Sequence, residues 1–363
     1  MARRRPGNGS LEPMTDATWP ALEHSEHDPV SILWLTTGLG CDGDSIAMTS
    51  ATNPSVEDLL CGCLPGMPPV ILHNPVFAFE NGEEFVRAFE DAAAGRLDPF
   101  VLVLEGSVPN EEINGDGHWA GMGTDPATGQ PILTNTWIDR LAPRAAAVLA
   151  LGTCAAYGGI PAMRNNPTGA MGLRDYLGWN WVSRLGIPIV NLPGCPVQPD
   201  SITATLLHLV LRLARIGPDL DLDGQGRPRA IFGRTVHEVC NRAGLAEVGA
   251  FSNVHGDGRC LVKLGCKGPV VKCNVPIRGW TNGVGGCPNV GGICMACTMP
   301  GFPDKYMPFV EADVAAGLYA RTPRIAHGPV AKYLRDRRIR RSFDVEPKWR
   351  RRGAELTSGY QPR

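Results

Sequence analysis

The fold is decided by Val30-Ser31-Ile32-Leu33-Trp34-Leu35 and by the turn Gly38-Leu39-Gly40-Cys41 that follows it. The first part is a short apolar run of the kind that forms a buried strand, and the turn places a cysteine just beyond its end. Similar apolar runs predict further strands at 70–72, 100–104, 146–151 and 187–192. Helical patterns separate or follow them at 55–60, 82–94 and 201–216. Strands that alternate with helices predict a parallel α/β sheet that is covered on both faces.

The length of the chain and the change in its composition along the sequence indicate two domains with flanking segments. The chain has 363 residues, a net charge of −1, 44 glycines and 32 prolines. This length suits two domains, and the near-zero charge gives no general attraction to nucleic acid or to a membrane surface. We predict an N-terminal arm at 1–28, a first domain at 29–217, a second domain at 218–317 that begins with a polar linker at 219–229, and a basic extension at 318–363.

The terminal segments of the chain indicate where in the cell we expect the protein to be. Met1-Ala2-Arg3-Arg4-Arg5 has the basic start of an export signal, but acidic residues follow it instead of an apolar stretch. No run of 18 apolar residues occurs in the sequence. We therefore expect a cytoplasmic protein that associates with a membrane only through a partner. The basic residues at 332–352 indicate a solvated or partner-docking face, not a nucleic-acid site.

The twelve cysteines are the most informative feature of the composition. Disulfide-rich chains are usually short and secreted, so cysteines in a chain of this size are better explained as metal ligands. Cys41, Cys154 and Cys195 each follow a predicted strand and are flanked by glycine or proline. Because ligands of an open α/β sheet gather at the carboxyl ends of its strands, we expect these three thiols to converge.

Two carboxylates accompany the first-domain cysteines. Asp44 stands three residues after Cys41, where a fourth ligand is expected; alternatively, it caps a following helix. Glu105 follows a predicted strand and either lies near the cysteines or has a structural role. The stretch Gly38–Gly43 also matches the dinucleotide fingerprint G-x-G-x-x-G, with Glu57 about 20 residues on. A cysteine and two acids at that place would repel a pyrophosphate, so nicotinamide binding is the weaker alternative.

The second domain holds two further sets of candidate ligands. Between residues 237 and 304 the apolar residues show little helix or strand periodicity, so the segment cannot form an ordinary hydrophobic core. It needs cross-links to fold, and bound metal clusters can provide them. The first set is His237, Cys240, Cys260 and Cys266, and the second is Cys273, Cys287, Cys294 and Cys297. Cys61 and Cys63 are left over as buried thiols, a redox pair or another site. Zinc is the rival metal, but its ligands usually come in close pairs, whereas these spacings run from two residues to over a hundred. The pattern favours iron–sulfur clusters.

Several motifs together resemble the small subunit of nickel–iron hydrogenases. They cover about residues 30 to 305 and include Gly152-Thr153-Cys154-Ala155-Ala156-Tyr157-Gly158-Gly159, Leu192-Pro193-Gly194-Cys195-Pro196, His237-Glu238-Val239-Cys240 and Gly292-Ile293-Cys294-Met295-Ala296-Cys297. The resemblance implies a flavodoxin-like first domain with a proximal cluster and a loop-rich second domain with medial and distal clusters. The implied ligand sets are proximal Cys41, Asp44, Cys154 and Cys195; medial Cys273, Cys287, Cys294 and Cys297; and distal His237, Cys240, Cys260 and Cys266.

The resemblance also implies partners and a role. The nickel–iron centre belongs to a separate large subunit, so this chain has no catalytic residues of its own; at most, Glu105 lies near the proximal cluster. Electrons from hydrogen oxidation are expected to pass through the proximal, medial and distal clusters to an acceptor protein or a quinone system. A heterodimer with the large subunit, or a dimer of such heterodimers, is the implied assembly.

Two positions depart from the usual family pattern. Asp44 replaces a cysteine, and Cys287 replaces the proline that accompanies a three-iron medial cluster, so three [4Fe–4S] clusters are expected. Both changes resemble the actinobacterial-type, high-affinity and oxygen-insensitive branch, which is linked to hydrogen uptake at trace levels in air. Gly43 and Gly159 stand where another oxygen-tolerant type has extra cysteines. The alternatives are the related subunit of respiratory NADH:quinone oxidoreductase, which lacks the second domain, and a zinc-stapled scaffold without a redox role.

Overall fold

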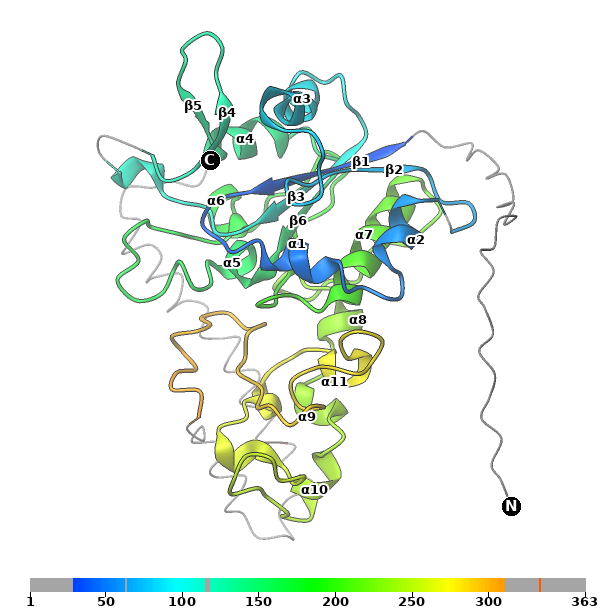
Figure 1. Ribbon diagram of the computed structural model, residues 1–363, viewed down its shortest axis with the longest axis vertical. Helices are drawn as coiled ribbons and strands as arrows, with labels where there is room; N and C mark the ends of the chain where they lie inside the picture. Colours follow the sequence, from blue (N-terminus) through cyan, green and yellow to red (C-terminus); the bar gives the residue numbers. More distant parts are fainter. Residues whose placement is uncertain (1–28, 63, 115–117, 311–332, 334–363) are drawn as a thin grey trace, which may run out of the picture.

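The computed structural model describes residues 29–62, 64–114, 118–310 and 333. A five-stranded parallel sheet occupies one end of this part of the molecule, and a region of short helices and loops lies beyond one edge of the sheet (Figure 1). The strands lie in the order β2-β1-β3-β6-β7. Their bounds are β1 (Val30–Thr36), β2 (Val70–His73), β3 (Phe100–Glu105), β6 (Ala147–Leu151) and β7 (Val190–Leu192). The predicted α/β class is confirmed, and the strand order is that of flavodoxin-like sheets.

Helices cover both faces of the sheet. One face carries α1 (Gly43–Met48), α2 (Val56–Leu60) and α7 (Pro199–Leu213). The other carries α3 (Gly82–Ala93), α4 (Thr134–Leu141) and α6 (Leu173–Leu177). Side chains of β1 alternate between the two cores: Leu33 packs under α3 and α4, whereas Ile32 and Trp34 pack under α1 and α7. Burial on both faces explains why these strands read as continuous apolar runs.

Some boundaries differ from the sequence predictions. The strand predicted at 187–192 begins only at Val190, because Pro188 pairs outside the sheet in a bridge with Val182. The helix predicted at 201–216 runs over Pro199–Leu213, so it starts and ends earlier. The hairpin of β4 (Gly121–Thr124) and β5 (Pro131–Leu133) was not predicted, because its strands are short and largely exposed. The predicted arm at 1–28 and, apart from Tyr333, the predicted extension at 318–363 lie outside the described residues.

The second region is built from short pieces. Its helices are α8 (Arg229–Phe232), α9 (Val236–Val239), α10 (Ala243–Glu247) and α11 (Val275–Arg278), with 3-10 turns at Leu261–Leu264 and Gly268–Val270. One small apolar cluster includes Val271, Met299 and Phe302, and a second includes Phe251 and Val262. No described helix is both long and apolar enough to cross a membrane.

The segment predicted as a polar linker, 219–229, contains a buried ion pair. The guanidinium of Arg227 is fully buried and lies 2.9 Å from the carboxylate of Asp223. The same guanidinium donates to the carbonyl oxygen of Thr298 at 3.4 Å, and it lies over the ring of Phe232. A buried cation needs such partners, and these contacts attach the segment to the second region. The amide of Asn191 in β7 donates to the carbonyl oxygen of Gly226 at 2.8 Å, so the same segment is also bonded to the sheet and does not run through solvent.

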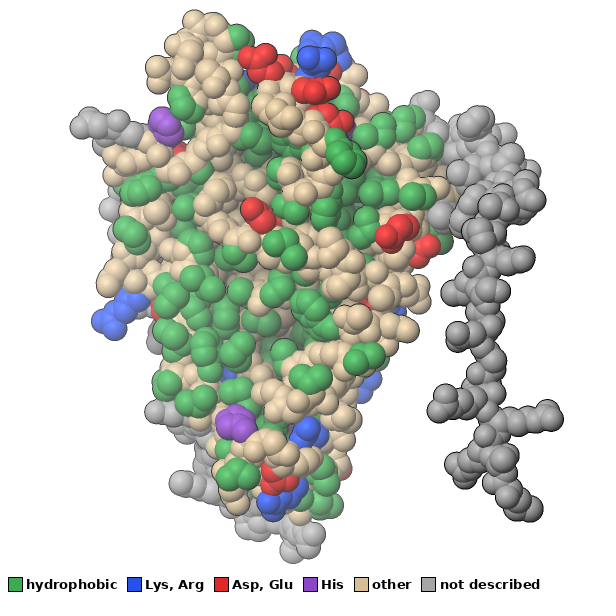
Figure 2. Space-filling view, in the orientation of Figure 1, with side chains coloured by type: hydrophobic (Ala, Val, Ile, Leu, Met, Phe, Trp, Pro, Cys, Tyr) green, Lys and Arg blue, Asp and Glu red, His purple; other side chains and the backbone are tan. Residues whose placement is uncertain are grey.

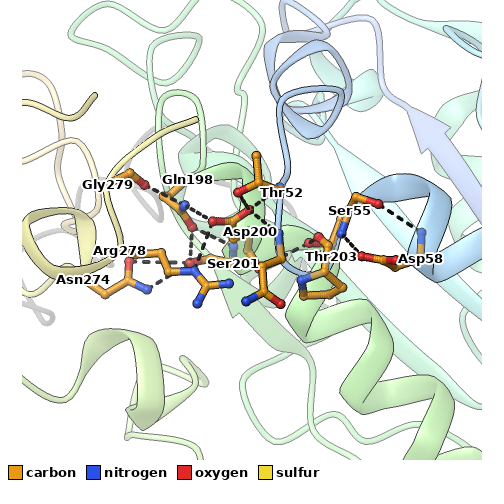
Figure 3. A network of polar contacts seen from close by, with 12 residues as sticks. Thr52, Ser55, Asp58, Gln198, Asp200, Ser201, Thr203, Asn274, Arg278 and Gly279 are labelled. Carbon is orange, nitrogen blue, oxygen red and sulfur yellow. Dashed lines mark hydrogen bonds and ion pairs between the residues drawn. The ribbon is translucent and has the colours of Figure 1, made fainter. Parts of the chain in front are cut away.

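A second polar junction centres on Asp200, in the first turn of α7 (Figure 3). Its carboxylate accepts hydrogen bonds from the amides of Thr52 at 2.6 Å and Asn53 at 3.2 Å, and it pairs with Arg278 at 3.0 Å. The neighbouring Gln198 donates to the carbonyl oxygen of Gly279 at 2.8 Å. These bonds fasten the end of α11, from the second region, to the start of α7.

We predict that Asp200→Asn weakens this junction. Burial alone would raise the pKa of Asp200, but hydrogen bonds from backbone amides and Gln198, together with the Arg278 cation, lower it. A lowered pKa means that the carboxylate stabilises the fold above the unfolded-state pKa of about 3.9, and that this stability is lost as pH falls through the folded-state value. The variant should lose about 2 kcal/mol at pH 7 and progressively less in acid.

Denaturant unfolding of the full chain at a series of pH values measures this difference. Asp98→Asn is the matched control, because Asp98 pairs with Arg184 where both side chains are nearly half exposed. An exposed pair contributes at most about 1 kcal/mol. Equal losses in the two variants at pH 7 would contradict the role given to Asp200.

Candidate metal centres

The predicted proximal residues converge at the carboxyl edge of the sheet. Cys41 and Asp44 follow β1, Cys154 lies in the short helix α5 (Gly152–Tyr157) after β6, and Cys195 follows β7. After burial, the largest effect, the proximity of Cys195, Asp44 and Cys41 also raises the pKa of the Cys154 thiol, which reaches about 12. Strands β1 and β3 flank the point where the strand order reverses, which is the usual place for a ligand in such sheets.

Asp44 faces the cysteines and does not cap a helix. Its Oδ1 accepts a hydrogen bond from the amide of Val197 at 2.7 Å, two residues after Cys195. Its Oδ2 occupies space that a side chain at Gly152 would fill, since a Cβ there would lie 2.1 Å away, and Gly152 has a φ of +82°. The helix α1 has its N-cap at Asp42 and receives no side-chain cap from Asp44, so the capping hypothesis is wrong.

Glu105, and not Asp44, accepts the hydrogen bonds of the amides at the N-terminus of α1. Its carboxylate accepts hydrogen bonds from the amide of Asp44 at 2.8 Å, the hydroxyl of Ser45 at 2.6 Å and the indole of Trp34 at 2.8 Å. A carboxylate at a helix N-terminus satisfies amides that have no partner within the helix. Glu105 is buried and adjacent to Asp44, so both interpretations of it hold: it lies beside the proximal residues and its contacts are structural.

The medial residues surround a cavity of about 380 Å³. Cys273, Cys287, Cys294 and Cys297 all line it. Cys195 of the proximal set lines the same cavity, together with apolar residues such as Phe232 and Val271. The cavity therefore lies where the second region meets the sheet edge, and it is large enough for a group with several heavy atoms.

The distal candidates belong to the second region, where α9 lies between α11 and α10 (Figure 1). His237 is in α9 and Cys240 directly follows that helix. The thiols of Cys266 and Cys240 lie close enough to Cys260 to add to the effect of burial, which raises its pKa to about 11. A Cβ on Gly268 would lie 3.4 Å from the sulfur of Cys266 and 3.6 Å from the amide nitrogen of His237, so these two ligand candidates are neighbours.

Backbone amides point at several of these sulfurs. The amide of Arg242 donates to Cys240 at 3.4 Å, and the amide of Cys294 donates to Cys266 at 3.3 Å. Amide hydrogen bonds also lower the pKa of Cys154, Cys273 and Cys297, although burial, the larger effect, raises all three. Hydrogen bonds to sulfur favour thiolate and are one of the ways in which proteins set the potential of an iron–sulfur cluster.

The donor chemistry fits a cationic group with thiolate ligands. Burial raises the pKa of Cys273 to about 11 and that of Cys294 well above its usual value, so these thiols do not ionise by themselves at neutral pH. Burial, and secondarily Glu105, raises the pKa of Asp44 to about 8, and no described cationic side chain pairs with it. Iron would supply the missing positive charge and hold these groups deprotonated.

Within the described ranges, no group of three His, Cys, Asp or Glu side chains is spaced to hold a single metal ion. No disulfide joins any of the eleven described cysteines. Cys61 is exposed, against the expectation of a buried thiol, and Cys63 lies outside the described residues.

The glycine-rich turn after β1 serves packing and not phosphate binding. A Cβ on Gly40 would lie 3.0 Å from the Cα of Gly106, and the amide of Ser107 donates to the carbonyl oxygen of Leu39 at 2.9 Å. The turn thus needs glycine because the loop after β3 lies against it. Asp44 stands in the first turn of the next helix, where its carboxylate would repel a pyrophosphate.

Two contact residues at the proximal site could not be found from the sequence. The amide of Val197 binds Asp44, and the hydroxyl of Thr153 donates to the carbonyl oxygen of Cys297. The paired positions are separated by 153 and 144 residues, respectively, and no pattern within either segment indicates the pairing.

Comparisons with known proteins relate the chain to hydrogenase small subunits. The family model for the C-terminal part of the NiFe/NiFeSe hydrogenase small subunit matches residues 232–310, and that for the 20 Kd subunit of NADH ubiquinone oxidoreductase matches residues 41–209. The periplasmic [NiFeSe] hydrogenase small subunit of Desulfomicrobium baculatum is 32% identical over 78% of this chain and 87% of its own length. The F420 non-reducing hydrogenase I small subunit of Methanosarcina mazei is 36% identical over 81% of this chain and 78% of its own.

A solved structure is more similar still. A chain of the actinobacterial-type NiFe-hydrogenase from Ralstonia eutropha H16 is 57% identical, with a TM-score of 0.81 over 93% of this chain and 97% of that one. The similarity to the respiratory subunit is confined to the first domain, whereas the similarity to hydrogenases extends through both.

Proposed function

The chain belongs to the family of nickel–iron hydrogenase small subunits, and we propose that it holds three [4Fe–4S] clusters in a row between a large subunit and an electron acceptor. Its role is electron transfer within a hydrogenase, as the sequence predicted. The finer proposal is supported by the neighbours of the candidate ligands: the proximal thiols and Asp44 lie near one another, the medial cysteines line one cavity, and the three distal cysteines lie near one another.

Bound clusters would accept and release single electrons, so a row of them connects a buried centre in one subunit to the surface of another. Cys41, Asp44, Cys154 and Cys195 would hold the first. The cavity-lining cysteines Cys273, Cys287, Cys294 and Cys297 would hold the second. His237, Cys240, Cys260 and Cys266 would hold the third. The amides of Arg242 and Cys294 would stabilise the reduced, more negative state at the last position.

A large subunit is the partner that this family requires. Cys41 is exposed, although the other proximal ligand candidates are partly or fully buried, so this side of the site lacks a cover within the described chain. Ile46 in α1 and Ile160 after α5 are each at least half exposed. Figure 2 shows hydrophobic side chains gathered on the face that carries α1 and α5 in Figure 1. We propose that the large subunit, which contains the nickel–iron centre, covers this face, because an apolar patch of this kind marks an interaction site.

The acceptor side lies around the distal residues. Because α10, which follows Cys240, lies at the end of the second region farthest from the sheet, an acceptor protein or quinone system would dock there (Figure 1). The similarity to the actinobacterial-type enzyme supports a place in that branch, for which we propose oxygen insensitivity. We also propose that the heterodimers pair into a dimer of heterodimers. Mass measurement of the purified complex tests the assembly, and cell fractionation tests the proposed cytoplasmic location with membrane association through a partner.

Metal and sulfide analysis of the complex is the first test of the function. Three cubanes predict about twelve irons and a matching amount of sulfide per small subunit, with hydrogen-dependent reduction of a dye when the large subunit is present. The large subunit without this chain should not reduce the dye. About three zincs without sulfide would refute the proposal.

Asp44→Cys tests the oxygen ligand. The thiolate would replace a carboxylate that now binds the amide of Val197 at 2.7 Å, so both the ligand and that hydrogen bond change. We expect the proximal redox midpoint to shift while the iron content is retained. Potentiometric titration followed by paramagnetic resonance measures it, with Asp42→Cys as the control because Asp42 is the exposed N-cap residue of α1. An unchanged midpoint and spectrum would exclude Asp44 as a ligand.

Cys287→Pro tests the fourth medial ligand. Cys287 lines the medial cavity and its substitution leaves three cysteines there. We expect one iron to be lost per chain and a three-iron signal to be present in the oxidised protein. Cys61→Ser is the matched control, since Cys61 is also exposed but does not line that cavity. A spectrum without a three-iron signal, at undiminished iron content, would show that Cys287 is not a ligand.

A further inference from the structure

Thr153 contacts segments from both the proximal and the medial sets. It precedes the proximal candidate Cys154, and its side chain is almost fully buried. Its amide donates to the carbonyl oxygen of Gly194 at 2.8 Å, one residue before Cys195. Its hydroxyl donates to the carbonyl oxygen of Cys297, a medial candidate. A single residue therefore ties two proximal segments to one medial segment.

The same two segments also meet at the medial cavity. Cys195 and Cys297 both line it, and the backbone amide of Cys195 is near enough to the Cys297 sulfur to lower the pKa of that thiol, although burial, the larger effect, raises it. The position of the 297 segment relative to the 195 segment therefore determines how close the two ligand sets lie, and the Thr153 hydroxyl bond helps to fix that position.

The junction around Asp200 holds a different part of the boundary. It fastens α11, beyond Cys273, to the start of α7 (Figure 3). We therefore expect the two regions to stay attached when the Thr153 hydroxyl is removed, with the change confined to the 297 segment. This separates a local effect on ligand position from a loss of the whole interface.

We propose that Thr153 is a positioning residue that sets the separation between the proximal and medial ligand sets through its hydroxyl bond to Cys297. The proposal rests on the proposed function, since it concerns the spacing of the groups that those sets hold. Electron tunnelling falls steeply with distance, so a small shift of the 297 segment changes the first transfer step inside this chain. No titration or new ligand is involved; the hydroxyl acts through the position of a backbone carbonyl.

Thr153→Val removes the hydroxyl at nearly constant volume, and Thr153→Ser keeps it. We expect the assembled complex of large and small subunits with Thr153→Val to retain its iron, sulfide and individual cluster signals. The magnetic interaction between the reduced proximal and medial clusters should change, seen as altered splitting and relaxation in paramagnetic resonance. Thr153→Ser should restore the wild-type interaction. The hydrogen-driven reduction of the medial cluster, followed after rapid mixing, should slow in Thr153→Val only.

Thr203→Val is the matched control. The Thr203 hydroxyl is equally buried and donates to the carbonyl oxygen of Pro54 at 2.7 Å, across a similar sequence separation but away from both ligand sets. Two results would overturn the proposal. One is a magnetic interaction between the proximal and medial clusters that is the same in Thr153→Val as in the wild type and in Thr203→Val. The other is a change of that interaction in Thr153→Ser as large as the change in Thr153→Val. If Thr153→Val binds no clusters, Thr153→Ala is measured instead; its failure to bind them as well would make Thr153 an assembly residue and overturn the positioning role. A wild-type complex without clusters would refute the proposed function itself, which is a separate outcome.

Discussion

The parallel direction of five strands is the constraint on which the rest of the structure depends. Because β1, β3, β6 and β7 all end at one edge, the residues that follow them meet there although they are more than 150 positions apart. The buried registers between β1 and β3 and between β3 and β6 fix the heights at which those turns begin. A one-residue slip in either would move every side chain of a strand to the wrong core, so the position of the turns is set by the packing of both faces.

Because the candidate ligands come together at the sheet edge and in the second region, most of them are removed from water. Thiols and a carboxylate that lie out of water hold their protons, as the raised pKa values of Cys154, Cys273 and Asp44 show. Two kinds of group offset this: amides that donate to the sulfurs, and the cationic iron that the proposed clusters supply. The second region has only small apolar clusters of its own, so its stability depends on these ligands and on the junctions at Arg227 and Asp200. Metal binding and folding are coupled in such a segment.

The features that could be predicted from the sequence are those that depend on neighbouring residues in the chain. Apolar runs located the strands, glycine and cysteine located the turns, and the resemblance supplied the grouping of the ligand candidates. It did not predict contacts between distant segments. Val197 binding Asp44, Glu105 accepting from the amide of Asp44 and Arg227 donating to the carbonyl oxygen of Thr298 are all pairings of a polar group with a partner that only the folded chain brings near. The short strand β7 was predicted too long and the β4–β5 hairpin was missed, because each has too few residues to show a period.

The two regions are joined by the same segments that carry the ligands. The stretch after Cys195 continues through Val197, which binds Asp44, to Asp200, which binds Arg278. The stretch after Cys273 forms α11 and returns Arg278 to the same carboxylate. A change in how the regions pack must therefore move ligands, and a change in a ligand must strain the packing. The proposed task of the protein is electron transfer over fixed distances. A stable interface between the two regions therefore also keeps the distances between the ligand sets constant. The boundary is held by two kinds of contact. Phe232 of the second region packs into the apolar core of the first, and directional polar bonds such as those of Asp200 limit how far the two regions can slide along each other.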